Sequence, residues 1–84
     1  MAETEIGRVS DFFAKPVVAG IQLTAPLKVG DRIVIKGHTT SLEMVVTSMQ
    51  IHNATVQEAK AGDAVGIKLP DRVRHGDLVY RITA

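Results

Sequence analysis

Residues 60–68 read Lys60-Ala61-Gly62-Asp63-Ala64-Val65-Gly66-Ile67-Lys68, a tight-turn signal followed by alternating apolar residues. The same signal, a basic residue two positions before a Gly-Asp pair, recurs at residues 28–31 and 74–77. Glycine accepts the positive φ that a tight turn requires, and an aspartate side chain can bond a nearby backbone N–H. The chain is therefore predicted to turn and enter a strand three times in the same way.

Alternating apolar residues predict further strands around these turns. Valine and isoleucine number eighteen against five leucines, and side chains branched at Cβ suit a pleated sheet. Pro16 predicts a turn at residues 14–16, and residues 25–31 form a connection with an apolar anchor or two. A change of phase between residues 42 and 51 predicts a bulge near Thr47-Ser48. The expected strands cover residues 6–13, 17–24, 32–36, 42–51, a short segment around Val56, residues 64–69 and residues 78–83. The expectation is an all-β fold: one domain, residues 1–84, forming a small closed antiparallel β-barrel of about six to seven strands.

Composition excludes several classes of protein. The chain has no cysteine, so it contains neither disulfides nor thiolate metal sites. Ten basic and nine acidic side chains give a net charge of +1, without the basic excess of dedicated nucleic-acid binders. No apolar run is long enough to cross a membrane, and the acidic start, residues 1–5, lacks the features of a signal peptide. We expect a cytoplasmic protein with no membrane partner.

Several segments resemble domain 2, a β-barrel, of translational GTPases such as elongation factor Tu. Val17-Val18-Ala19-Gly20 and residues 27–33 resemble the opening hairpin of that domain. Residues 56–67 resemble its alanine–glycine–aspartate turn and following strand, and residues 73–79 resemble its closing strand. The resemblance covers nearly the whole chain and implies the barrel fold.

Residues 35–40, 48–52 and 66–68 are closer still to small standalone proteins called translation elongation factor-like. Similar barrels also resemble the C-terminal extension of some bacterial U32-type peptidases. The Gly-x-x-x-x-Gly-Lys-Ser/Thr loop that holds nucleotide phosphates is missing. GTP binding is therefore not expected, and no cofactor is expected.

Catalytic and metal sites are weakly supported by the residue pattern. His38, His52 and His75 could ligate zinc across strands, but they have neither cysteine partners nor His-x-His spacing. The serines lack the context of a nucleophile elbow, and the Gly-Asp aspartates are interpreted as turn residues. We expect no enzymatic activity and no metal site.

Polar and basic residues supply candidate contacts with RNA or a partner. The loop containing His38, Thr39 and Thr40 is one candidate, because loops on rigid scaffolds often carry function. A second contains Arg72, Arg74 and His75, and Lys36 belongs to a basic stripe with Lys28 and Arg32. Solvated loops and faces explain the same residues without a partner.

Two functions follow from these observations. The first is a non-catalytic binding module that contacts RNA, tRNA or the translation machinery, as the resemblance implies. The second is a protein–protein adaptor, a detached counterpart of a barrel normally fused to a larger enzyme such as a U32-type peptidase. A homo-oligomer is compatible with the second.

Overall fold

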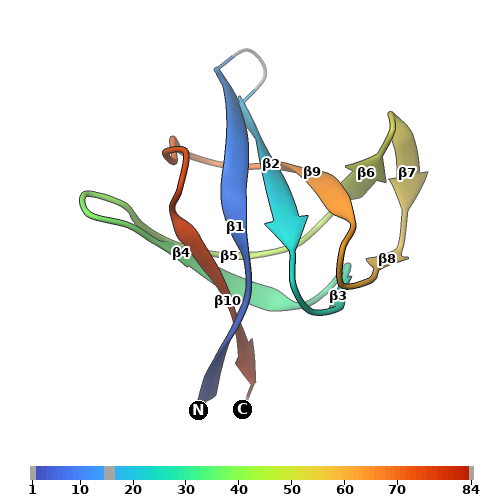
Figure 1. Cartoon of the computed structure of the whole chain (residues 1–84), viewed down its shortest axis with the longest axis horizontal. Helices are drawn as coiled ribbons and strands as arrows, with labels where there is room; N and C mark the ends of the chain where they lie inside the picture. The colour runs from blue at the N-terminus through green and yellow to red at the C-terminus, as the bar shows by residue number, and fades with distance from the viewer. Residues whose placement is uncertain (1, 15–16, 84) are drawn as a thin grey trace.

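The computed structural model describes residues 2–14 and 17–83, in which every regular element is a β-strand (Figure 1). The strands are β1 (Ala2–Ala14), β2 (Val17–Leu23), β3 (Leu27–Lys28), β4 (Arg32–Lys36), β5 (Ser41–Val45), β6 (Met49–Ile51), β7 (Ala54–Val56), β8 (Glu58–Ala59), β9 (Ala64–Lys68) and β10 (Leu78–Thr83). The predicted all-β class is confirmed. The predicted turn at residues 14–16 falls largely outside the described residues. No helix in the part of the chain described here has the length and apolarity needed to cross a membrane.

Eight strands form one antiparallel sheet in the order β5-β4-β10-β1-β2-β9-β6-β7. The long strand β1 lies at its centre and pairs with β10 through its first half and with β2 through its second half. Its register shifts against β10 between Glu5 and Gly7, and against β2 between Val9 and Asp11. Such irregularities bend a strand and increase its twist, so they help the sheet to curl around the core.

The sheet is not a closed barrel, which corrects the prediction from sequence. Among the described residues, no ladder pairs either edge strand, β5 or β7, with a strand across the opening. After β5 the backbone of Val46 bonds to the turn at Gly30 and Asp31, and the chain then crosses the opening through Thr47 and Ser48. Met49 begins a strand that pairs with β9 and β7 instead. The change of hydrophobic phase therefore marks a switch between strands, and the predicted bulge at Thr47-Ser48 is wrong.

The three Gly-Asp pairs form the predicted turns. Gly30, Gly62 and Gly76 have φ angles of 99°, 93° and 91°. In each turn the aspartate N–H donates to the carbonyl of the basic residue three positions earlier, at 3.0–3.1 Å. A carboxylate oxygen of the same aspartate accepts from the N–H of that basic residue, at 2.8–3.0 Å. One local hydrogen-bond pattern is thus used three times.

Each turn is also bonded to a distant segment by two backbone hydrogen bonds. The glycine N–H donates to the carbonyl of a buried residue, and the N–H of that residue donates to the aspartate carbonyl, at 2.8–2.9 Å. The buried residues are Val46 for the first turn, Leu23 for the second and Val9 for the third. The turns therefore fix connections against β1, the end of β2 and the residue after β5.

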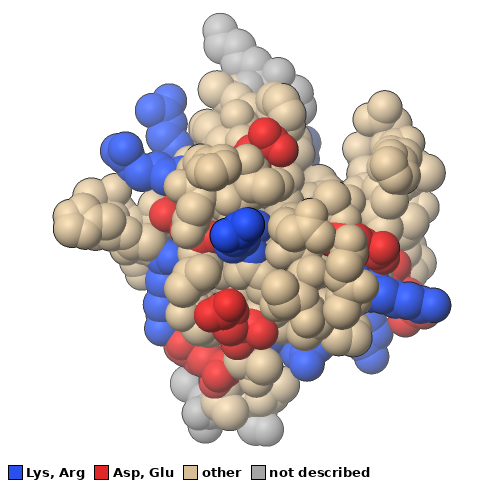
Figure 2. Space-filling model, viewed as in Figure 1, with Lys and Arg blue, Asp and Glu red and all other residues tan. Residues whose placement is uncertain are grey.

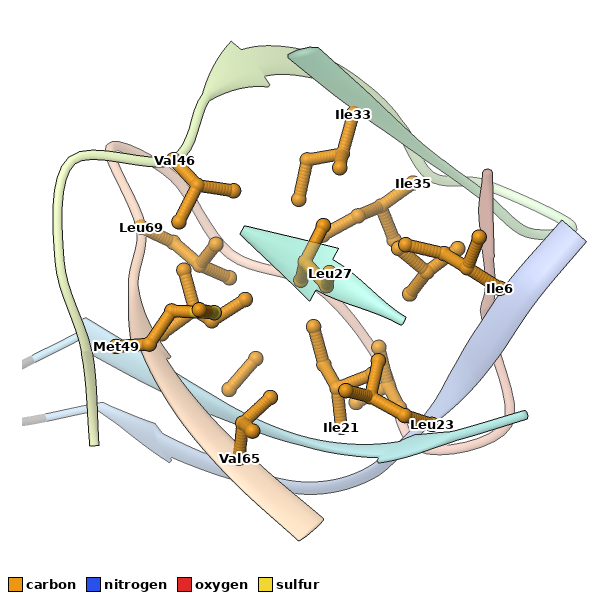
Figure 3. Close-up of a cluster of buried hydrophobic side chains, with 14 of the residues drawn as sticks. Ile6, Ile21, Leu23, Leu27, Ile33, Ile35, Val46, Met49, Val65 and Leu69 are labelled. Atoms are coloured by element: carbon orange, nitrogen blue, oxygen red, sulfur yellow. The ribbon is translucent and has the colours of Figure 1, made fainter. Parts of the chain in front are cut away.

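Apolar side chains fill the interior of the curled sheet (Figure 3). The inward positions of β2 and β9, such as Ile21 and Val65, alternate with outward ones, as their period-two patterns predict. The short sheet of β3 and β8 places Leu27 fully buried among these side chains. Leu27 is the apolar anchor that the sequence predicts for residues 25–31.

Candidate functional site

The two loops that carry the predicted contact residues meet at their bases. Lys36, at the end of β4, pairs in register with Leu78, at the start of β10. Beyond this pair, the buried carboxylate of Asp77 lies against the backbone of Gly37. The loop containing His38, Thr39 and Thr40 therefore begins beside the end of the loop containing Arg72, Arg74 and His75.

Several of the basic side chains are already engaged within the protein. Lys36 forms an ion pair with Glu3, and its ammonium lies 5.3 Å from the centroid of the Tyr80 ring. The guanidinium of Arg72 lies 6.0 Å from the centroid of the Phe12 ring. Basic and acidic side chains are interspersed on the face drawn in Figure 2. The contact role of Lys36, His38, Thr39, Thr40, Arg72, Arg74 and His75 stays a prediction.

The histidines lie in three different connections. His38 follows β4, His75 precedes β10, and His52 lies with Asn53 in the turn between β6 and β7, where both have positive φ. In residues 2–14 and 17–83, no three His, Asp or Glu side chains group in a way that could hold a metal ion.

A hollow on the outer face of the sheet was not predicted from sequence. It has a volume of about 470 Å³ and lies between the β1–β2 end and the β6–β7 hairpin, where the outline in Figure 2 is notched. One cross-strand row gives its floor: Asp11 on β1 pairs with Gly20 on β2, Gly20 with Gly66 on β9, and Gly66 with Gln50 on β6. Two adjacent glycines leave the middle of this row as bare backbone.

Side chains rise on both sides of this floor. Phe13, which is 57% exposed, and Val18 are cross-strand neighbours on one side, and His52 and Asn53 lie on the other. The Ser10 hydroxyl oxygen lies 3.2 Å from the Gly20 carbonyl oxygen and links β1 to β2 beside the hollow. The hollow thus has an apolar side formed by Phe13 and Val18, a polar side formed by His52 and Asn53, and a floor of backbone between them.

Two smaller hollows continue from the first along β9. One, of about 200 Å³, shares Val18, Gln50 and Gly66 with it and also reaches Lys68. The other, of about 330 Å³, lies at the opening of the sheet, where Lys68 and Pro70 approach Val45. The alternate residues Ala64, Gly66, Lys68 and Pro70 line these three neighbouring hollows, which together we call the β9 groove.

The sequence contained part of the signal for the β9 groove. Gly20 and Gly66 both fall on the outward phase of an alternating strand, where a side chain is normally present. Their meeting depends on the pairing of β2 with β9, which are more than forty residues apart. Local patterns do not specify that pairing.

Comparisons with known proteins point to peptidases. No family model matches the chain. It is 53% identical over 77 residues to an uncharacterised protease of Methanocaldococcus jannaschii, covering 90% of this chain and 19% of that protein. It is 31% identical over 81 residues to a collagenase of Porphyromonas gingivalis, covering 94% of this chain and 22% of that protein. The chain thus spans about a fifth of the length of the curated relatives it matches.

The structural comparison agrees with the sequence comparison. The C-terminal domain of a putative U32 peptidase of Geobacillus thermoleovorans superposes with a TM-score of 0.86, at 14% identity, covering 93% of this chain and 91% of that domain. The predicted membership of the translation elongation factor-like group is therefore wrong: the sequence relatives are named a protease and a collagenase. The segments quoted for that resemblance consist largely of Gly-Asp turns and the strands beside them, features that build a fold and specify no activity. The chain has the fold of the C-terminal domain of a putative U32 peptidase.

Proposed function

We propose that the chain is a non-catalytic module that binds polypeptide for a peptidase of the U32 type. The observation that carries this proposal is the match to about a fifth of a protease and of a collagenase, combined with the fold of a terminal peptidase domain. Enzymes with these names act on polypeptides, so a module common to them works beside a polypeptide. Of the two functions considered from sequence, this one develops the adaptor.

The arrangement of polar side chains supports a binding role. A binding role needs a surface that a partner can reach. The β9 groove supplies such a surface, with exposed aromatic, amide and backbone groups.

Fluorescence anisotropy with fluorescein-labelled gelatin, a denatured collagen, tests the proposal. We expect saturable binding with a Kd below about 100 µM, the affinity of a modest, partly polar interface. Gel electrophoresis after prolonged incubation should show the gelatin intact. Labelled tRNA serves as the comparison and should bind more weakly at physiological ionic strength.

Two results would contradict the proposal. One is the absence of gelatin binding, and tight, salt-sensitive binding of tRNA in its place would support the RNA hypothesis instead. The other is cleavage of gelatin by the purified chain, since this would require a catalytic centre that the proposal denies.

A further inference from the structure

We propose that the β9 groove binds an extended polypeptide and that its Asp11 end selects a basic side chain. This inference rests on the proposed function, because it names the polypeptide-binding surface and one preferred residue of the ligand. It is carried by three independent features: the length of the groove, its bare floor and the charge of its lining.

The dimensions of the groove suit a polypeptide in extended conformation. The hollows follow β9 from Ala64 to Lys68 and continue past its end to Pro70. At about 3.3 Å per residue the five residues of β9 alone span roughly 17 Å, the length of about five extended residues. A compact small molecule would fill only one of the three hollows.

The floor of the groove lacks a side chain at Gly66, although the packing around Gly66 leaves room for one. A Cβ atom placed on Gly66 would meet its nearest neighbour, Val18 Cγ1, at 3.6 Å, an ordinary van der Waals distance. Gly66 does not have a positive φ, so its backbone conformation does not require glycine either. Glycine inside a strand weakens it and commonly marks a place where a ligand or another backbone approaches closely. The missing side chain therefore leaves room for a bound chain against β9.

The lining at one end of the groove complements a cation. Asp11 and Phe13 lie on the same face of β1, opposite Gly20 and Val18. Among the described residues that line this hollow, the charged side chain is the Asp11 carboxylate, and no lysine or arginine is present. The exposed Phe13 ring offers a cation–π surface beside it.

An arginine of the ligand can use these groups together. Its alkyl stem can lie over Val18, its guanidinium can stack on Phe13, and its N–H groups can donate to the Asp11 carboxylate. Lys68 lines the adjoining hollow, so the negative character is confined to the Asp11 end. The groove thus has a direction as well as a preferred side chain.

The test compares two fluorescein-labelled amidated heptapeptides that differ only in one central residue, arginine or its neutral isostere citrulline. With the unmodified protein we expect the arginine peptide to bind about tenfold more tightly, a difference typical of a charge-assisted contact supported by an aromatic ring. Asp11→Asn should reduce the ratio of the two Kd values to about one, since it removes the charge and keeps the shape. Gly66→Ala should weaken both peptides severalfold by occupying the floor.

Asp71→Asn is the matched control, because Asp71 is an exposed aspartate that does not line the groove. It should leave both Kd values unchanged, and all variants should keep the far-UV circular dichroism of the parent. Equal Kd values for the two peptides, or an unchanged ratio in Asp11→Asn, would overturn the inference. If gelatin still binds in either case, the proposed function stands and only the site is wrong. If gelatin does not bind the unmodified protein, both fail.

Discussion

Gly37→Ala is expected to destabilise the protein by about 2–3 kcal/mol, because the added methyl group has no room beside a buried side chain. A Cβ atom added at Gly37 would overlap the Asp77 carboxylate, whose oxygens and Cγ are its three nearest atoms. The carboxylate is held in place, because Asp77 is only 6% exposed and accepts a hydrogen bond from the Arg74 N–H at 2.8 Å. Gly37 is not among the positions with positive φ, so the loss measures the steric conflict and not backbone strain.

A double-mutant cycle separates this contact from other effects. Asp77→Ala alone should cost about 1–3 kcal/mol, because it leaves the Arg74 N–H without its acceptor. In that background Gly37→Ala should cost less than about 1 kcal/mol, since the overlapping atoms are gone. Urea denaturation followed by circular dichroism gives the free energy of unfolding of the parent, the two single variants and the double variant.

Asp31→Ala is the control for the turn itself. Asp31 makes the equivalent hydrogen bond to Lys28 but is partly exposed, so its loss should cost less than that of Asp77. Equal costs for Gly37→Ala with and without Asp77 would show that the two loops do not meet as described.

Leu27→Ala should cost about 3 kcal/mol, within the range for truncating a fully buried leucine. Leu27 lies on the two-residue strand β3, and its side chain reaches the centre of the core (Figure 3). A domain of this length has a total stability of roughly 4–13 kcal/mol. The substitution therefore removes a large fraction of the margin, and the urea midpoint should fall markedly.

Leu42→Ala provides the comparison, because Leu42 is only partly buried at the edge strand β5. It should cost about 1 kcal/mol, less than half of the loss at Leu27, since less apolar area is removed from water. If the two substitutions cost the same, the β3–β8 sheet does not hold Leu27 inside the core.

Local physical chemistry explains what the sequence could predict. The positive φ and aspartate hydrogen bonds of the Gly-Asp turns depend on four consecutive residues, so the turns were predicted correctly. The same holds for the alternation in β2 and β9, where the apolar phase defines the inward face. It does not hold for β4, which buries three residues in a row, or for β10, where the buried residue is Val79 and the phase of Leu78 and Ile82 is only partly buried.

Closure of the sheet could not be predicted, because it depends on which strands meet. A change of phase near Thr47 is compatible with a bulge in one strand or with two strands that have different partners. The second is observed: β5 pairs with β4, whereas β6 pairs with β9 and β7. The register shifts that bend β1 likewise leave no clear mark in an apolar pattern.

The candidate site also depends on strand pairing that the sequence does not specify. Exposed polar loops and basic residues can be recognised in a sequence, so His38 and Arg72 were selected from it. A groove floored by Gly20 and Gly66 exists only after β2 pairs with β9. Gly20 and Gly66 matter because they lack side chains, and this can be recognised only once the structure shows that they are neighbours.

Binding of polypeptide to the β9 groove is tested most directly by a nitrogen–proton correlation NMR titration of the isotope-labelled protein with unlabelled gelatin peptides. If polypeptide binds the outer face of β9, the backbone N–H signals of Gly20, Gln50 and Gly66 should shift first and saturate together. The signals of His38, Arg74 and His75 should remain in place. Shifts confined to those three residues, or no shift at saturating peptide, would contradict the claim that the outer face of β9 binds polypeptide.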